Sequence, residues 1–213
     1  MNEFINKNII DYVEFNSQQE PSLLKELNKE TNLKILNPRM LCSSYQGRVL
    51  SIISKIIKPK KVLEIGTYTG YSALCIAEGL DHNGIIHTID INEELKDIQN
   101  KYFIKSGLVN QIQQHVGNAL KIIPKINEIF DFVYLDADKE NYIEYFDLII
   151  DKIISGGVLI CDNVLWSGKV LNPKNQDLIT QKLIEFNKLL KKDKRLDTII
   201  LPIRDGLSIC RKI

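Results

Sequence analysis

The 213-residue chain lacks the sequence features that mark several large classes of protein. Its four cysteines, Cys42, Cys75, Cys161 and Cys210, lie far apart and form no C-x-x-C pair, so neither a zinc cluster nor a disulfide framework is indicated. No uninterrupted apolar stretch approaches the ~18 residues of a membrane helix, and the N-terminus has no apolar signal-peptide core. We therefore expect free, mostly buried thiols and a cytoplasmic protein without a membrane partner.

The chain also lacks an excess of charge of either sign. It has 28 Lys and Arg against 27 Asp and Glu, which gives a formal net charge of +1. A global basic field of the kind that attracts nucleic acids or membranes is therefore excluded, and only a local basic patch is compatible with the composition. Hydrophobic residues at 44% and charged residues at 26% are ordinary for a globular domain and exclude a disordered chain.

From Lys61 onward, short runs rich in Val and Ile alternate with helical patterns, which is typical of βαβ units around a parallel sheet. The expected strands are Val62 to Ile65, Ile85 to Ile89, Ile112 to Val116, Phe130 to Leu135, Gly157 to Cys161, Thr198 to Pro202 and Leu207 to Cys210. The segment between the last two is too short for a crossover helix, so an antiparallel hairpin is predicted there. We predict a Rossmann-like, doubly wound α/β fold with a mixed sheet of seven strands.

Helical patterns precede and connect these strands. The expected helices are Ile5 to Phe15, Ser22 to Lys29, Tyr45 to Ile57 with Ser43 or Ser44 as N-cap, Tyr71 to Leu80, Glu93 to Ser106, a short one near Leu120, and Tyr142 to Ile154. The length favours one domain spanning residues 1–213. Within it we expect an N-terminal helical lid over residues 1–58 and a cofactor-binding core over 59–213. The charge run from Lys188 to Arg195 is interpreted as a solvated helix end.

The first predicted strand runs into a glycine-rich turn that lacks the G-x-G-x-x-G spacing of dinucleotide-binding proteins. Gly66 and Gly70 are spaced G-x-x-x-G, and a helical pattern follows them. This arrangement brings backbone N–H groups close to a ligand. Glu64, just before the turn, would repel a pyrophosphate but tolerate a cationic nucleoside such as S-adenosylmethionine. The sequence therefore favours S-adenosylmethionine over NAD or FAD, and a tight turn without a ligand is the alternative.

The second predicted strand is followed by Asp90, roughly 20 residues beyond the glycine-rich turn, where an acidic side chain can accept both hydroxyls of a ribose. An Asp at a strand end also serves as a helix N-cap, but Asn92 can take that role here. Asp90 therefore strengthens the prediction of a nucleoside cofactor.

Three oxygen-bearing side chains follow the fourth and fifth predicted strands. Asp136 comes directly after one, and Asp162 and Asn163 come directly after the other. Carboxylate and amide oxygens without His or Cys select Mg²⁺, or Mn²⁺ and Ca²⁺, over zinc. The sequence predicts that these three side chains converge on one hard divalent cation, and capping of the following helices is the alternative for each residue alone.

Two further residues next to these acids are candidates for chemistry. Lys139 follows Asp136 by three positions and is expected to place its amine in the same crevice, where burial and a divalent cation both favour the neutral form of a lysine. We interpret it as a candidate general base, with an exposed lysine as the alternative. Trp166, the only tryptophan, follows the predicted metal ligands and can stack on a flat substrate or pack in the core.

Together these residues resemble the divalent-metal-dependent class I O-methyltransferases, the family that includes catechol and caffeoyl-CoA O-methyltransferases. The matching segments, in chain order, are Pro38-Arg39-Met40, Gln46-Gly47, Glu64 to Ser72, Asp90, Gly117-Asn118-Ala119, Asp136 to Lys139, Asp162 to Gly168, Leu201-Pro202 and Asp205-Gly206-Leu207. Their order and spacing cover nearly the whole chain.

The resemblance implies a role for the matching residues. The predicted cofactor-binding set is Met40, Glu64, Gly66, Thr67, Tyr68, Gly70, Ser72, Asp90, Ile91, Gly117, Asn118, Ala119, Asp136 and Asp138. Asp136, Asp162 and Asn163 would hold the metal, and Lys139 would be the catalytic base. Met40, Lys139 and Trp166 would contact the acceptor. Family habit also implies a homodimer.

We therefore predict an enzyme that transfers a methyl group from S-adenosylmethionine to one of two adjacent hydroxyls of a small aromatic acceptor, with Mg²⁺ bound. One alternative keeps the chemistry and takes a hydroxylated uridine in tRNA as acceptor, with Arg39 and the run from Lys188 to Arg195 as a phosphate track. Another is a non-catalytic nucleoside-binding protein, which the intact set of Asp136, Lys139, Asp162 and Asn163 disfavours.

Overall fold

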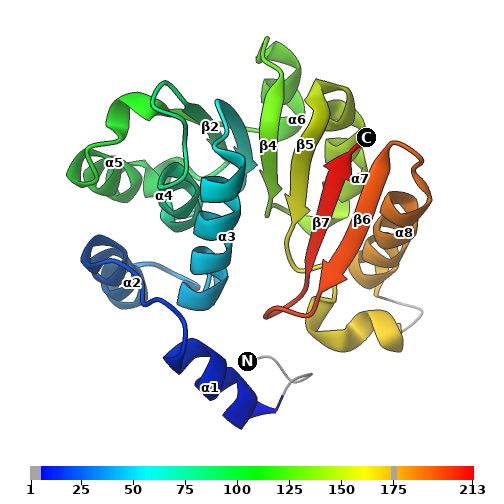
Figure 1. Ribbon diagram of the computed structural model, residues 1–213, viewed down its shortest axis with the longest axis horizontal. Helices are drawn as coiled ribbons and strands as arrows, with labels where there is room; N and C mark the ends of the chain where they lie inside the picture. Colours follow the sequence, from blue (N-terminus) through cyan, green and yellow to red (C-terminus); the bar gives the residue numbers. More distant parts are fainter. Residues whose placement is uncertain (1–5, 174–176) are drawn as a thin grey trace.

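The structure, a computed structural model, describes residues 6–173 and 177–213. Seven strands form one sheet in the order β3-β2-β1-β4-β5-β7-β6 (Figure 1). Their bounds are β1 Lys61–Ile65, β2 Ile85–Asp90, β3 Ile112–Val116, β4 Phe130–Leu135, β5 Ile153–Cys161, β6 Leu196–Leu201 and β7 Leu207–Lys212. Strands β1 to β5 are parallel, and β7 runs antiparallel to both β5 and β6. The predicted fold class, including the C-terminal hairpin, is confirmed.

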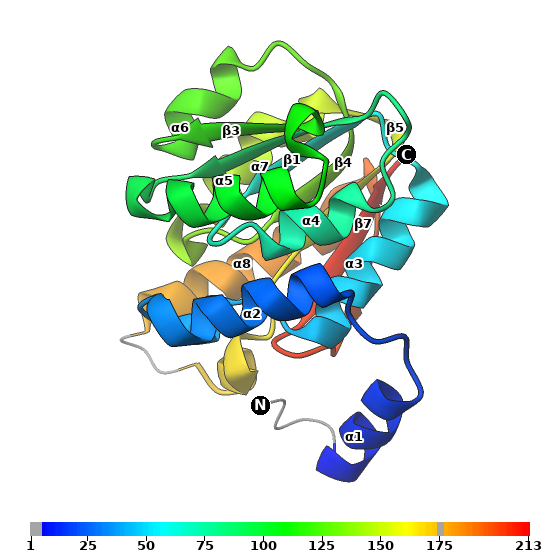
Figure 2. The ribbon, with the colours of Figure 1, turned by 90° about the vertical axis from the view of Figure 1, so that its left-hand side faces the viewer.

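Helices cover both faces of the sheet (Figures 1 and 2). They are α1 Lys7–Phe15, α2 Ser22–Lys34, α3 Ser44–Ile57, α4 Tyr71–Ala77, α5 Lys96–Lys105, α6 Ala119–Ile122, α7 Tyr142–Ile149 and α8 Leu178–Lys192. Residues of α2 to α5 share one buried cluster with alternate strand residues such as Val62, and residues of α6 to α8 share the other with Leu63. Each of these strand side chains contributes roughly 1.5–3 kcal/mol by leaving water, so the sheet is stabilised from both sides.

The largest differences between predicted and observed boundaries in this part of the chain lie at the start of β5 and at the end of α7. Strand β5 begins at Ile153, four residues before the predicted start at Gly157, because its pairing with β4 shifts register around Gly156, which has a φ of +82°. Helix α7 ends at Ile149 and is followed by the short 3-10 helix η6 (Ile150–Lys152). The helix predicted to end at Ile154 is therefore two residues too long, because Ile153 and Ile154 belong to β5.

Near the N-terminus the predictions are accurate to about one turn. Ser43 caps α3 by accepting the Gln46 N–H at 3.2 Å, as predicted, and α2 continues to Lys34 rather than ending at Lys29. The predicted start of the first helix, Ile5, lies outside the described residues. Helix α1 buries none of its residues and lies apart from the sheet in Figure 2, whereas α2 and α3 pack into the core.

The described part of the chain has neither a helix that could span a membrane nor a disulfide. Across residues 6–173 and 177–213, no helix is both long enough and apolar enough to cross a membrane. All four cysteines are free and buried, as the sequence predicts. None of them therefore adds a covalent constraint to the fold.

The strand order creates a crevice between β1 and β4. The chain builds β1, β2 and β3 outward in one direction and then returns to place β4 on the other side of β1. In doubly wound sheets, ligands bind at the carboxyl ends of the strands where the winding direction reverses. Backbone bonds continue the strand pairing beyond this edge, since Asp136 N donates to Ile65 O and Asp162 N donates to Leu135 O, both at 2.9 Å. The strand-end residues therefore lie side by side.

Candidate active site

A pocket of about 700 Å³ opens at this edge of the sheet. Most of the predicted site residues line it, namely Met40, Gly66, Thr67, Tyr68, Ser72, Asp90, Ile91, Gly117, Asn118, Ala119, Asp136, Asp138, Lys139, Asp162, Asn163 and Trp166. Two predicted cofactor residues, Glu64 and Gly70, do not line the pocket. The structure thus brings together residues that are spread over most of the sequence.

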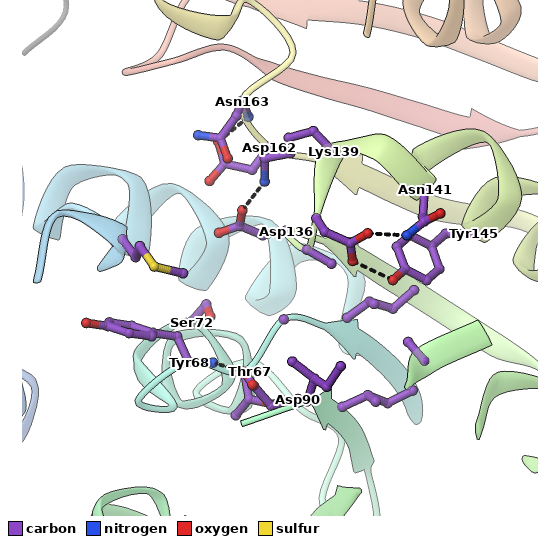
Figure 3. Close-up of a pocket in the computed structure, with 18 of the residues that line it drawn as sticks. Thr67, Tyr68, Ser72, Asp90, Asp136, Lys139, Asn141, Tyr145, Asp162 and Asn163 are labelled. Carbon is purple, nitrogen blue, oxygen red and sulfur yellow. Dashed lines mark hydrogen bonds and ion pairs between the residues drawn. The ribbon is translucent and has the colours of Figure 1, made fainter. Parts of the chain in front are cut away.

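One end of the pocket is formed by the turn after β1. Gly66 has a φ of +102°, and a Cβ atom there would lie 1.9 Å from the Asp136 carbonyl oxygen, so only glycine allows β1 and β4 to approach this closely. The Tyr68 N–H donates to Asp90 Oδ2 at 2.6 Å, and the Asn92 N–H donates to Asp90 Oδ1 at 2.8 Å. Each carboxylate oxygen has a further lone pair for a ligand, and Asp90 lines the pocket (Figure 3). Asn92 caps the next short helix, as predicted.

Glu64 lies behind this turn rather than in the pocket. Its side chain is completely buried, Oε2 accepts a hydrogen bond from the Thr88 hydroxyl at 2.5 Å, and Oε1 has no partner among the described residues. Burial raises the pKa of Glu64 to about 8, although hydrogen bonds from Ser72 and Thr88 oppose the shift. A buried carboxyl of this kind favours a nearby positive charge, because that charge would stabilise its ionised form.

Asp138 is fixed by two residues that the sequence analysis did not single out. Tyr145 Oη donates to Asp138 Oδ1 at 2.6 Å, and the Asn141 carboxamide donates to Oδ2 (Figure 3). Both partners come from the segment that follows β4, and both line the pocket. The only sequence signal for them was their helical spacing from Asp138, which also fits ordinary capping.

Lys139 and Asp136 form an ion pair at the end of β4. Lys139 Nζ donates to Asp136 Oδ1 at 2.8 Å, and the two side chains are 11% and 23% exposed. The same Nζ lies 5.0 Å from the centre of the Tyr142 ring, which is completely enclosed and packs against the core. The lysine amine is therefore held inside the pocket wall beside the predicted metal ligand, and is not a solvated surface charge.

Asp162 is almost completely buried, at 1% exposure, and other residues fix its carboxylate. Gln46 Nε2 donates to Asp162 Oδ2 at 2.6 Å, Tyr134 Oη donates to the same oxygen at 3.0 Å, and the Asn163 N–H donates to Oδ1 at 2.6 Å. Burial and the nearby Asp136 raise the pKa of Asp162 to about 6, while Lys139, Gln46 and Asn163 oppose the shift. Sequence reasoning gave Gln46 and Tyr134 no role, because each is far from Asp162 along the chain.

The loop after β5 carries two predicted residues in unusual backbone conformations. Asn163 and Trp166 have φ angles of +58° and +47°, values that cost energy in residues other than glycine and that concentrate at functional sites. The Trp166 ring packs on the edge of the core and also lines the pocket, and its stacking on a substrate stays a prediction. Its indole N–H is buried and has no partner among the described residues.

The donor set fits a hard divalent cation. The described residues contain no group of three His, Cys, Asp or Glu side chains arranged for a metal, and the predicted set instead combines two carboxylates with one carboxamide. Asp136 raises the pKa of the buried Asp162 by charge repulsion, after burial itself, so this edge holds more negative charge than Lys139 balances. An oxygen-preferring cation would relieve that imbalance. We therefore assign Asp136, Asp162 and Asn163 as the residues able to hold one.

Fold and site together define a class of protein: a Rossmann-like domain with a nucleoside-type pocket at its switch point. Comparison with known proteins identifies the family. The chain matches the family model described as O-methyltransferase over residues 14–213. It is 37% identical over 207 residues to a caffeoyl-CoA O-methyltransferase of Petroselinum crispum, an alignment that covers 92% of this chain and 86% of that protein. This chain therefore belongs to the O-methyltransferase family.

Solved structures agree with this assignment. The SAH-bound methyltransferase PaMTH1 of Podospora anserina superposes with a TM-score of 0.88 at 28% identity, over 98% of this chain and 97% of that one. An O-methyltransferase from Bacillus cereus in complex with SAH gives a TM-score of 0.86 at 28% identity, over 97% of both chains. The predicted family and the predicted class of enzyme, an O-methyltransferase, are confirmed.

Proposed function

We propose that this enzyme transfers a methyl group from S-adenosylmethionine to one hydroxyl of a vicinal dihydroxy phenolic acceptor, with a divalent cation bound. The observation that carries the proposal is the convergence of Asp136, Lys139, Asp162 and Asn163 in one pocket. Two solved relatives hold SAH, and curated relatives are named for a phenolic thioester, caffeoyl-CoA. The likeness supports a phenolic substrate class, and the pocket residues support the metal.

The cofactor would occupy the end of the pocket formed by the turns after β1 and β2. Asp90 has lone pairs for two ribose hydroxyls, and Asp138, fixed by Tyr145 and Asn141, can accept from the base. The pKa of the buried Glu64 is raised to about 8, and a cationic sulfonium in front of the turn would favour its ionised form, so this carboxyl suits a cationic cofactor. Met40 and Ser72 line the same pocket. Placement of the cofactor here leaves the strand-end acids free for the acceptor.

The acceptor would lie between the strand-end acids and Trp166. A divalent cation supplies one piece of chemistry, a lower pKa for a hydroxyl that chelates it. In its neutral form, Lys139 would take the hydroxyl proton, and the oxygen would attack the methyl carbon in line as the bond from that carbon to sulfur breaks. The products are the methyl ether, SAH and a protonated lysine, which Asp136 holds at 2.8 Å. Alignment of the two reactants supplies much of the acceleration.

We keep three broader expectations as part of this proposal: a homodimer, a cytoplasmic location, and a lid formed by residues 1–58. The lid is supported by Arg39 and Met40, which belong to the short helix η1 (Pro38–Met40) and line the pocket. Size-exclusion chromatography with light scattering tests the dimer. Hydrogen exchange with and without SAH tests the lid, because closure would protect amides near Met40.

No observation in the structure favours a tRNA acceptor. The basic run from Lys188 to Arg195 lies before the start of β6, which is parallel to β5, and so it sits at the sheet edge opposite the pocket. Arg195 is paired there with Asp151 and Asp193. Only Arg39 of the predicted phosphate track lies at the pocket. The tRNA acceptor therefore stays the second candidate.

The test is a methyl-transfer screen with labelled S-adenosylmethionine. Catechols, hydroxycinnamoyl thioesters, flavonoids and undermodified bulk tRNA are offered with added Mg²⁺ and again with chelator. We expect label on a vicinal dihydroxy phenol only in the presence of the metal. Label on tRNA alone, or transfer that chelation does not change, would overturn the acceptor class or the metal requirement, respectively.

A further inference from the structure

Two arginines from distant parts of the chain meet at the pocket. Arg39 belongs to η1, and Arg204 lies in the turn between β6 and β7; both line the pocket. Arg204 Nη2 donates to the Arg39 carbonyl oxygen at 2.8 Å, a contact between residues 165 positions apart. This bond holds the two segments together and uses only one of the five N–H groups of the Arg204 guanidinium.

The turn that carries Arg204 is attached to the loop that carries Trp166. Leu165 N donates to Asp205 O at 2.9 Å, and Val164 N donates to Gly206 O at 3.2 Å. A Cβ atom on Gly206 would lie 2.5 Å from Leu165 Cγ, so the turn and the loop are in tight contact. Because that loop also contains Asn163, Arg204 belongs to the acceptor end of the pocket and not to the Asp90 end.

Both guanidinium groups keep donors for a ligand. Among residues 6–173 and 177–213, neither Arg39 nor Arg204 has an ion-pair partner within hydrogen-bonding range, and the neighbouring Asp205 accepts the Ser167 N–H instead. Arg204 also has a φ of +50°, a conformation that glycine adopts at lower cost. The turn itself would form at lower energetic cost with glycine at this position, so the arginine side chain and its free donors indicate a role at the pocket.

We propose that the acceptor carries an anionic group, a carboxylate or a phosphate, which Arg39 and Arg204 bind while its two hydroxyls face the strand-end acids. This inference rests on the proposed function and narrows its substrate class. The planar guanidinium fork pairs with two oxygens of either anion. The pair would place positive charge at the acceptor end of the pocket, where it attracts an anionic acceptor. Neutral and cationic catechols would bind without this contact.

The experiment measures KM and binding for four catechols that differ in charge. They are 3,4-dihydroxybenzoate, caffeoyl-CoA, neutral 3,4-dihydroxybenzyl alcohol and cationic dopamine, each with Mg²⁺ and SAM for turnover or with SAH for calorimetry. The first two separate a carboxylate from a phosphate source. The variants are Arg39→Gln, Arg204→Gln and Arg204→Lys, and Arg211→Gln, an exposed arginine on β7, is the matched control.

We expect the wild type to prefer an anionic catechol over the neutral one by about 10-fold in KM or Kd. Arg39→Gln and Arg204→Gln should each remove most of that preference by raising the KM or Kd of the anionic catechols, while the values for the neutral alcohol stay close to those of the wild type. Arg204→Lys should keep part of the preference, and the control Arg211→Gln should keep all of it. Added salt should reduce the preference in the wild type and in Arg211→Gln, which keep it in full, and should change little in the two glutamine variants of Arg39 and Arg204. These results together support the anion subsite and identify its source.

The outcomes that overturn the inference differ from those that overturn the function. Turnover of all four catechols with equal KM, or a preference that survives both glutamine variants, overturns the anion subsite and leaves the methyltransferase function intact. Binding that discriminates by charge without methyl transfer to any catechol overturns the proposed function and leaves the anion subsite. If no catechol binds and none is methylated, both the anion subsite and the proposed function are overturned.

Discussion

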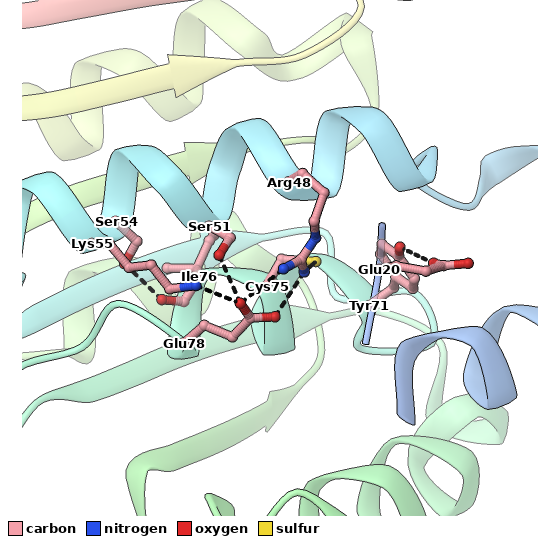
Figure 4. A network of polar contacts seen from close by, with 9 residues as sticks. All are labelled: Glu20, Arg48, Ser51, Ser54, Lys55, Tyr71, Cys75, Ile76 and Glu78. Atoms are coloured by element: carbon pink, nitrogen blue, oxygen red, sulfur yellow. Dashed lines mark hydrogen bonds and ion pairs between the residues drawn. The ribbon is translucent and has the colours of Figure 1, made fainter. Parts of the chain in front are cut away.

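Helix α3 contacts two partly buried clusters of charge, and they are built in different ways. At the start of the helix, Gln46 donates to Asp162. The strand-end acids Asp136 and Asp162 form one cluster with Lys139 and the buried Glu64. Further along, Arg48 pairs with Glu78 beyond α4 through two bonds of 2.8 and 2.7 Å (Figure 4). Asp136, Lys139 and Asp162 of the first cluster line the pocket, whereas Arg48 and Glu78 do not.

The pKa shifts of the two clusters have opposite signs. Burial opposes ionisation of Glu78, but hydrogen bonds from Arg48, Lys55 and Ser51 lower its pKa to about 2. Burial raises the pKa of Asp162 to about 6, and the repulsion of Asp136 adds to it. A cluster whose charges are already balanced holds two helices together. A cluster with surplus negative charge would be stabilised by a positively charged ligand, and carboxyl groups with raised pKa values of this kind concentrate at functional sites.

Replacement of a strand-end acid gives the largest expected effect. Asp162→Ala should lower kcat/KM by roughly 10³-fold or more, because a metal ligand is lost, while the protein stays folded. Rates at several Mg²⁺ concentrations and a urea titration measure the two effects. Asp97→Ala, an exposed change on α5, is the control. Full metal-dependent activity in Asp162→Ala would show that the ends of β4 and β5 do not form one site.

Loss of the proposed base comes next. Lys139→Ala should lower kcat by roughly 10²–10⁴-fold with little change in SAH affinity, whereas an ordinary surface lysine such as Lys188 should show no effect. The pH profile separates two roles for the amine. Recovery of the rate as pH rises supports a base, because hydroxide and water then take the proton, and a uniform defect at every pH indicates positioning instead. A variant with normal rates at all pH values would refute both.

The balanced cluster should show the opposite behaviour to the strand-end acids. Glu78→Gln leaves Arg48 without its counter-charge and should lower the free energy of unfolding by roughly 3 kcal/mol, with kcat of the folded protein nearly unchanged. Urea titrations and rates below the transition measure this. The double variant Arg48→Met/Glu78→Leu should recover part of the loss, because it removes both charges. A large loss of kcat without a loss of stability would break the comparison.

The sequence predicted the strand-end acids because their positions depend only on where strands end. Asp136 and Asp162 follow buried apolar runs directly, and parallel strands end at the same edge of a sheet. It could not assign Gln46 a contact, because a residue 116 positions from Asp162 meets it only through the packing of α3. Glu64 shows the same limit, since alternation of side chains along β1 turns it behind the pocket wall.

The ribose contact is a smaller test at the cofactor end. Asp90→Ala should weaken SAH binding by roughly 1.5–3 kcal/mol, the size of lost hydrogen bonds to a charged group. Part of that loss would come from the turn after β1, because Asp90 Oδ2 accepts the Tyr68 N–H at 2.6 Å and Asp90→Ala removes this bond. Asp90→Asn keeps one acceptor for this bond and should lose less. Calorimetry measures both variants, and unchanged affinity in Asp90→Ala would remove this residue from the site.

The smallest effect concerns how stability depends on pH at the two clusters. The folded pKa of Glu64, about 8, lies above its usual 4.5, so its stabilising contribution is present below pH 4.5 and is lost as pH rises through about 8. Glu78 has the reverse sign, because its pKa of about 2 makes its contribution present above pH 4.5 and lost as pH falls toward 2. In metal-free protein, Glu64→Gln should therefore remove roughly 1–2 kcal/mol of the stability lost between pH 5 and pH 8, whereas Glu78→Gln should leave that loss in place. Urea titrations at the two pH values measure the difference, and equal slopes in wild type and Glu64→Gln would mean that Glu64 is already ionised within the fold.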